Sequence, residues 1–241
     1  MNALRLAAAL PALGLAANFS AAADRDALRA IVQEQCLVHW SQQRSPLPCE
    51  SVGADFAVLA DRKGGAHFLL IPTRTIAGIE SPEVLERGAP NYFAAAWQAR
   101  DRLAAKVGHE VSRSAVGLAL NPKHARSQDQ LHIHIECLRA DVAASLRAAS
   151  GHITTAWSPV SIAGWHYDAL RVMGEDLGAA NPFHLLADQP PQAKAALEDY
   201  SLIVAGMQFN EGPGFVVLTG TGLAGELLLD SSCLVANGAT T

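Results

Sequence analysis

The chain has 241 residues, of which 50% are hydrophobic and 17% are charged, so it can bury one sizeable core or two small ones. Its formal net charge at pH 7 is −5, and its 18 lysine and arginine residues are scattered rather than clustered. Such a chain lacks the positive field that attracts nucleic acids, so DNA and RNA are excluded as expected partners.

Residues 1–23 have the composition of an export signal. Arg5 supplies a positive end, residues 6–17 form an apolar stretch, and the small residues 21–23 offer a cleavage site. An uncleaved membrane anchor is the alternative, because residues 4–23 contain only one charged side chain, and a buried N-terminal helix is a third reading. We therefore expect an exported protein that is periplasmic or attached by its N-terminus to the outer side of the inner membrane.

Residues 24–241 contain no low-complexity linker and are expected to form a single domain. Their hydrophobic periodicity predicts strands joined by hairpins and interrupted by helices, which is typical of an α+β fold: an antiparallel sheet with helices packed on one side. The two predicted hairpins resemble each other in layout, which leaves a duplicated half-domain open. In chain order, the expected elements are a helix at 24–40, strands at 55–60 and 67–71, a helix start at 81–83, a helix at 91–107, strands at 116–120 and 130–138, a helix at 141–150, and strands at 200–207 and 215–219.

Four cysteines follow the N-terminal segment, and an even number in an exported chain favours disulfide bonds. Of the three pairings that four cysteines allow, the short segment between Cys36 and Cys49 favours Cys36–Cys49 together with Cys137–Cys233. The second bond would tie the C-terminal region to the predicted strand 130–138. Four free buried thiols in a cytosolic protein are the alternative reading.

The predicted strand 130–138 carries the side chains best suited to catalysis or ligand binding. Because alternate side chains of a strand share a face, Gln130, His132, His134 and Glu136 are expected to point one way and the apolar residues between them the other. An amphipathic strand whose histidines face water is one interpretation. A second is a nucleophilic imidazole, because a neutral ring offers a lone pair near pH 7 and histidine is an established covalent catalyst.

A metal site is the third interpretation of this face. It takes His132 and His134 as ligands, with His124, Asp129 or Glu136 as the third.

The polar loop before the strand suits phosphate binding. Arginine offers a fork of donors, and hydroxyl, amide and backbone N–H groups offer neutral donors to phosphate oxygens. Since this loop directly precedes the histidines, we predict that it contacts a phosphate rather than forming a solvated turn. The donors in question are Asn121, Lys123, His124, Arg126, Ser127 and Gln128.

These segments resemble a known family. Residues 127–135, Ser-Gln-Asp-Gln-Leu-His-Ile-His-Ile, resemble the His-x-His-x-His signature of the histidine-triad superfamily, and the chain resembles the CDP-diacylglycerol pyrophosphatase family more closely. The resemblance covers most of the chain after the N-terminal segment. It extends over residues 34–37, 48–49, 69–73, 78–82, 91–93, 96–101 and 137–142.

The resemblance implies a histidine-triad-like catalytic domain that hydrolyses CDP-diacylglycerol to CMP and phosphatidate without a cofactor or a metal. It places the nucleophile on His132 and the third triad position on His134, both catalytic, while Gln130 occupies the first position. Together with the loop residues Asn121, Arg126, Ser127 and Gln128, Gln130 is assigned to substrate binding. The expected partners are CDP-diacylglycerol and a membrane surface, and a homodimer is left open.

Two further functions stay open at this point. One is a metal-dependent phosphoesterase that uses His132 and His134 as ligands. The other is a non-catalytic exported protein that binds nucleotides or phospholipids, because the glutamine at position 130 cannot carry a proton charge.

Overall fold

The computed structural model describes residues 24–62, 64–189 and 196–237. The export signal or anchor predicted at 1–23 lies outside these residues. Within them, no helix combines the length and the apolar character that crossing a membrane requires.

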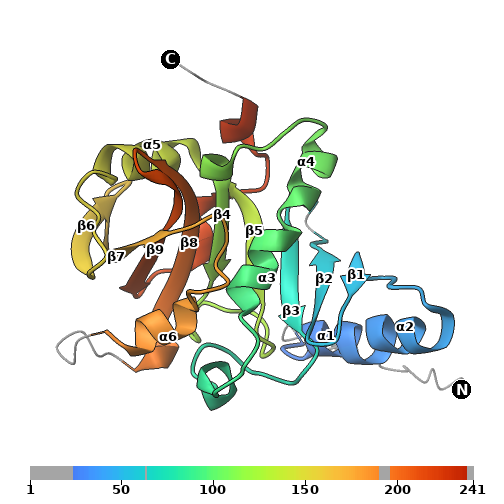
Figure 1. The fold of residues 1–241 in the computed structure, drawn as a ribbon. Helices are drawn as coiled ribbons and strands as arrows, with labels where there is room; N and C mark the ends of the chain where they lie inside the picture. The colour runs from blue at the N-terminus through green and yellow to red at the C-terminus, as the bar shows by residue number, and fades with distance from the viewer. Residues whose placement is uncertain (1–23, 63, 190–195, 238–241) are drawn as a thin grey trace, which may run out of the picture.

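The described strands form one ten-stranded antiparallel sheet, which confirms the α+β class (Figure 1). Their order is β1-β2-β3-β5-β4-β8-β9-β7-β6, and β10 also pairs with β5. The strands are β1 (Ser51–Val52), β2 (Phe56–Ala60), β3 (Phe68–Pro72), β4 (Val116–Leu120), β5 (Ile133–Leu138), β6 (Ser158–Ile162), β7 (Trp165–Met173), β8 (Tyr200–Phe209), β9 (Gly212–Thr221) and β10 (Leu229–Asp230).

One pattern of connections occurs on both sides of the central β4–β8 pair. On one side the hairpin β2–β3 is followed by helices and the pair β4–β5, and on the other the hairpin β6–β7 is followed by a helix and the pair β8–β9. The order β2-β3-β5-β4 therefore corresponds to β6-β7-β9-β8. The duplication considered from the sequence paired the hairpin at 55–71 with the one at 200–219, which are β2–β3 and β8–β9. In the structure the hairpin equivalent to β2–β3 is β6–β7 instead.

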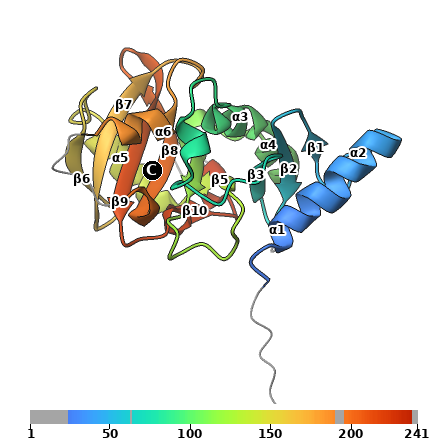
Figure 2. The ribbon, with the colours of Figure 1, turned by 90° about the horizontal axis from the view of Figure 1, so that it is seen from below.

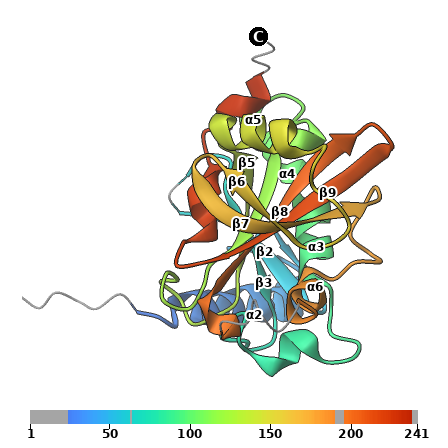
Figure 3. The ribbon, with the colours of Figure 1, turned by 90° about the vertical axis from the view of Figure 1, so that its left-hand side faces the viewer.

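Helices cover both faces of the sheet, so the expectation that they pack on one side is wrong. Successive residues of a strand face opposite ways. Leu118 of β4 packs in one core cluster with Phe93 and Trp97, whereas its neighbour Ala119 packs in another cluster with Leu146. The helices on these two faces are α3 (Tyr92–Ala99), followed by α4 (Asp101–Val107), and α5 (Ala140–Ala149), which lies beside β6 (Figure 3).

An N-terminal helical rod lies over one face of the sheet, against β2 and β3 near its β1 edge (Figure 2). Its consecutive segments are α1 (Ala27–Ala30), the π-helix η1 (Ile31–Cys36) and α2 (Leu37–Gln43). Leu28 and Val32 of this rod are buried with Ala57 and Ile71 of the sheet. The predicted helix 24–40 is therefore confirmed, with both its start and its end three residues later.

The two predicted disulfide bonds are present. Cys36–Cys49 ties the helical rod to the segment before β1, and Cys137–Cys233 ties β5 to the C-terminal segment. All four cysteines are thus oxidised, and the reading of four free thiols is wrong.

Most predicted boundaries agree with the structure, and the helix predicted at 91–107 is an example. The predicted helix 91–107 starts at a cap, where Asn91 accepts a hydrogen bond from Ala94 N–H, and ends at Gly108, whose φ of +81° suits a glycine. The predicted helix start at 81–83 is only a 3₁₀ turn, η2 (Pro82–Leu85).

The strand predicted at 130–138 begins later, at β5. Before it, Leu131 donates its N–H to Ile76 O, in the loop after β3, instead of to a neighbouring strand. The remaining elements were not predicted: β1, β6, β7, β10, α6 (Pro182–Ala187), η3 (Arg113–Ala115), η5 (Leu197–Asp199), η6 (Gly225–Leu228) and η7 (Leu234–Asn237).

Candidate active site

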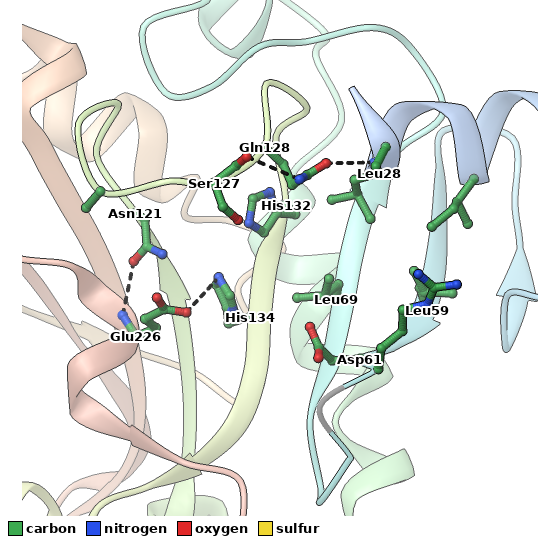
Figure 4. Close-up of a pocket in the computed structure, with 14 residues that line it drawn as sticks. Leu28, Leu59, Asp61, Leu69, Asn121, Ser127, Gln128, His132, His134 and Glu226 are labelled. Carbon is green, nitrogen blue, oxygen red and sulfur yellow. Dashed lines mark hydrogen bonds and ion pairs between the residues drawn. The ribbon is translucent and has the colours of Figure 1, made fainter. Parts of the chain in front are cut away.

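A pocket of about 400 Å³ lies between the helical rod, the predicted histidine strand and the loop that follows β4 (Figure 4). Its two histidines face apolar side chains of the rod and of β2 and β3 across the pocket. The apolar lining residues are Ala27, Leu28, Ile31, Leu59, Leu69 and Ala125, and the polar ones are Asp61, Arg62, Asn121, Ser127, Gln128, His132, His134 and Glu226.

His132 has a defined orientation in this pocket. Its Nδ1 lies 2.7 Å from the carbonyl oxygen of Gln130, and because a carbonyl only accepts, Nδ1 must donate. The neutral ring then carries its lone pair on Nε2. Burial lowers the pKa of His132 below its ordinary value of 6.5, although the hydrogen bond to Gln130 acts in the opposite direction. The ring is therefore neutral at pH 7, as a nucleophile must be.

His134 lies beside His132, with ring centroids 5.1 Å apart, and belongs to a buried polar cluster. Its Nδ1 is 2.9 Å from Nε2 of His67, and its Nε2 is 3.5 Å from Oε2 of Glu226. Nε2 of His67 is also 3.2 Å from Oε1 of Glu136, and its Nδ1 is 3.8 Å from Oδ2 of Asp61. Three segments of the chain thus meet around His134: the β2–β3 hairpin, β5 and η6.

The loop after β4 supplies three of the predicted substrate-binding residues to the pocket lining: Asn121, Ser127 and Gln128. Asn121 Oδ1 accepts a hydrogen bond from Glu226 N–H at 3.2 Å, which joins the loop to η6. The amide of Gln128 accepts from Leu28 N–H at 2.8 Å, so its oxygen fixes the helical rod to the loop. The first bond fixes η6 and the second fixes the helical rod relative to this loop.

The structure does not bring Arg126 into the pocket lining. Its guanidinium is buried and forms a two-pronged pair with Glu80, at 2.7 and 2.8 Å, and a weaker contact with Asp129 at 3.3 Å. Gly78 leaves room for this pair, because a Cβ at that position would overlap Arg126 Nη1. The guanidinium therefore stabilises the loop from the side facing away from the pocket, through Glu80 and Asp129. The sequence predicted a contact with phosphate and not this structural role.

Gln130 is likewise outside the pocket lining. Its side-chain amide donates to the carbonyl oxygens of Pro72 and Arg74, at 3.1 and 2.9 Å. The face predicted for a continuous strand does not extend to it, because regular strand pairing starts at Ile133. Substrate contact by Gln130 stays a prediction, while its observed contacts hold the loop after β3 against the approach to β5.

One group among the described residues has the composition and spacing of a metal site, and it differs from the predicted set. The ligand atoms of His67, His134 and Glu136 all lie within 4.8 Å of one another. His132 is not part of this group, and Asp129 is instead held by Arg25 and Arg126. The hydrogen bonds from Arg25 lower the pKa of Asp129 to about 2, so it remains an anion in this role.

Sequence reasoning missed four polar residues of the site: Asp61, Arg62, His67 and Glu226. His67 stands at the start of the predicted strand 67–71, two positions before Leu69, so the two side chains share one face of that strand. A search for polar residues on that face could have found it. Glu226 gave no signal, because it reaches the site from a 3₁₀ turn near the C-terminus.

Comparison with known proteins supplies independent information. The sequence model of the family described as CDP-diacylglycerol pyrophosphatase matches residues 23–237. A protein of Yersinia pestis named CDP-diacylglycerol pyrophosphatase is 43% identical over 186 residues, which cover 76% of this chain and 72% of that protein.

Solved structures resemble the chain only distantly. Hnt3 in complex with DNA and guanosine matches with a TM-score of 0.33 and 12% identity, over 47% of this chain and 60% of that chain. The aprataxin ortholog Hnt3 from Schizosaccharomyces pombe matches with a TM-score of 0.32 and 12% identity, over 44% and 58%.

Proposed function

The chain belongs to the CDP-diacylglycerol pyrophosphatase family, and we propose that it hydrolyses CDP-diacylglycerol to CMP and phosphatidate with His132 as the nucleophile. One observation carries the assignment of the nucleophile. The hydrogen bond from His132 Nδ1 to Gln130 O leaves the lone pair on Nε2 of a buried, neutral ring that lines the pocket. A nucleophilic histidine needs this protonation state and this orientation.

The reaction has two steps in this proposal. Nε2 of His132 attacks the cytidylyl phosphorus, an N–P bond forms, and the anhydride P–O bond breaks to release phosphatidate. Phosphatidate is a phosphate monoester with a second pKa near 6, so it is a tolerable leaving group at neutral pH. Water then attacks the same phosphorus, the N–P bond breaks, CMP leaves, and His132 regains its lone pair.

The rest of the pocket would mainly position the two phosphates. His134, Asn121 and Ser127 line the pocket on the side of His132 and carry groups that can donate to phosphate oxygens. Gln130 would act from outside the pocket, by fixing the carbonyls of Pro72 and Arg74. This role requires an amide donor rather than a charge, which explains how a glutamine can occupy the first triad position.

A metal is not needed for any step of this scheme, because the imidazole itself supplies the lone pair. The direct test is an assay of CMP release from CDP-diacylglycerol in detergent, with and without EDTA, for the wild type and His132→Ala. We expect activity that survives EDTA and is lost in His132→Ala, whereas His166→Ala, which alters an exposed histidine on β7, should behave as wild type. Activity lost in EDTA and restored by zinc or manganese would contradict the scheme, as would binding of the lipid without release of CMP.

We also propose the cellular setting that the sequence suggests. Residues 1–23 would direct export or anchor the protein, residues 24–241 would form a single catalytic domain, and the enzyme would work at the outer side of the inner membrane, as a monomer or a homodimer. Two disulfide bonds support an oxidising compartment. Cell fractionation with an antibody to the folded domain tests this, and recovery in the cytosol would contradict it.

A further inference from the structure

A row of buried polar side chains runs beneath the pocket, and the proposed reaction leaves it without a role. His67 and Glu136 are 5% and 6% exposed and do not line the pocket, yet they lie next to His134, which does. Burying an imidazole and a carboxylate is costly unless both are hydrogen-bonded. The arrangement therefore calls for an explanation in terms of what it does to His134.

The two imidazoles of His67 and His134 face each other edge to edge. Their ring centroids are 5.1 Å apart, the planes are inclined by only 23°, and the nearest nitrogens are 2.9 Å apart. The centroid separation exceeds the N···N distance by 2.2 Å, which is close to the sum of the two ring radii. Both nitrogens therefore lie on the line between the ring centres, the geometry of an N–H···N hydrogen bond.

Glu136 decides which of the two nitrogens carries the proton. Its Oε1 lies 3.2 Å from Nε2 of His67 but 4.0 Å from Nδ1 of His134. The carboxylate is therefore nearer to a proton on Nε2 of His67 than to one on Nδ1 of His134, and this arrangement also leaves the proton of His134 on Nε2, 3.5 Å from Oε2 of Glu226. His67 is thus the donor, Nδ1 of His134 is the acceptor, and the proton of a neutral His134 sits on Nε2.

We propose that His67 is a positioning residue that keeps the N–H of His134 directed into the catalytic pocket. In the structure Nε2 of His134 lies 3.5 Å from Oε2 of Glu226, a second residue of the pocket lining. This inference rests on the proposed function. There, the Nε2–H of His134 would donate to the oxygen that departs with phosphatidate, in place of Glu226. Glu136 would act one step further away, by orienting His67.

The same side chains could be read as a metal site, and the ring geometry argues against that reading. Zinc holds histidine nitrogens at about 2.0–2.1 Å in tetrahedral directions, so the lone pairs of two ligands converge on the ion at an angle. The facing nitrogens of His67 and His134 point at each other instead. The N–H···N bond accounts for the distances without an ion.

Nitrogen-15 NMR of the wild-type protein tests the hydrogen bond without reference to activity. We expect a through-hydrogen-bond coupling between Nε2 of His67 and Nδ1 of His134, with the proton attached to His67. A proton on Nδ1 of His134 would overturn the proposal. So would one equivalent of zinc in the purified protein that is lost in Glu136→Gln, because the imidazoles would then be ligands. Since no substrate is needed, this result is independent of whether the proposed hydrolysis is correct.

Two substitutions of matched chemistry test the positioning role. An amide nitrogen in His67→Gln reaches about as far as Nε2, whereas the shorter His67→Asn places it near Nδ1, so only the first can donate to His134. We expect kcat within about threefold of wild type for His67→Gln and a loss of about tenfold or more for His67→Asn, with KM little changed in both. Equal kcat in the two variants, both folded by circular dichroism, would overturn the role. If both fail to fold, the NMR result on the wild type decides.

Discussion

The buried pair between Arg126 and Glu80 holds the loop that lines the pocket, and its loss should destabilise the protein measurably. Glu80→Gln keeps the size of the side chain and removes its charge. Arg126 is 5% exposed and Glu80 21% exposed at the side chain, so the guanidinium would be left with Asp129 at 3.3 Å as its charged partner in the described structure.

The expected magnitude follows from these contacts. Removing one partner of a buried ion pair costs about 3–5 kcal/mol, because an uncompensated charge remains. The glutamine oxygen can still accept one of the two bonds and Asp129 remains in place, so we expect a loss of about 2 kcal/mol for Glu80→Gln. For a chain of this size that corresponds to a fall in Tm of about 4–8 °C.

The effect should depend on pH with a defined sign. Burial by itself raises the pKa of Glu80, but the hydrogen bonds and charge of Arg126 outweigh it and hold the pKa below its ordinary value of 4.5. The stabilisation is therefore present above that ordinary value and is lost as the pH falls through the lowered one. Urea unfolding of wild type and Glu80→Gln at pH 7 and at about pH 3 should show a difference that shrinks in acid.

A matched control separates this pair from surface ion pairs. Asp26 pairs with Arg29 at the surface, where the two side chains are 54% and 36% exposed, so Asp26→Asn should change stability by less than about 0.5 kcal/mol. If Glu80→Gln unfolded at the same urea concentration as Asp26→Asn, the reasoning about the loop brace would be wrong.

Three further outcomes are expected. Since burial lowers the pKa of His132, the acid limb of kcat/KM should lie below pH 6.5, and a limb above that value in a pH–rate profile would contradict a buried nucleophile. Replacing Cys137 and Cys233 together by alanine removes a disulfide bond that closes a loop of 96 residues, and the chain-entropy model gives a loss of about 4–5 kcal/mol in the free energy of unfolding. The change should also lower kcat, because the segment before Cys233 carries Glu226. An unchanged Tm in a calorimetric scan would refute the expected loss of stability. Gln130→Leu removes the donor to two carbonyls and should cost about 2 kcal/mol in urea unfolding, whereas unchanged stability together with a raised KM would indicate substrate contact instead.

The local pattern of apolar and polar residues was sufficient to predict the elements that have a distinct start, end or periodicity of their own. The strand Val116–Leu120 was predicted to the residue, because a run of apolar residues buried on both faces has clear ends. The helix after Asn91 was predicted from its cap and its helix-forming residues, and both disulfide pairings followed from spacing. By contrast, β6 contains Pro159 and is largely solvent-accessible, so neither periodicity nor composition marked it as a strand.

The candidate active site was predictable only where its residues lie close together in the sequence. His132, His134, Asn121, Ser127 and Gln128 lie within one stretch of chain, and the structure places all of them around the pocket. Arg126 and Gln130 belong to the same stretch, but partners far away in sequence, Glu80 for one and the carbonyls of Pro72 and Arg74 for the other, turn them outward. Contacts of that kind depend on tertiary packing, which no local pattern encodes.

The central claim is that His132 forms a bond to the cytidylyl phosphorus. Mass spectrometry after a rapid base quench during turnover of CDP-diacylglycerol tests it most directly, because an N–P bond to histidine survives base but is cleaved in acid. The peptide that contains His132 should carry a cytidylyl group early in the reaction, in wild type but not in His132→Ala. A modified His134 or full turnover by His132→Ala would contradict the claim. Incorporation of oxygen from labelled water into phosphatidate instead of CMP would contradict it as well.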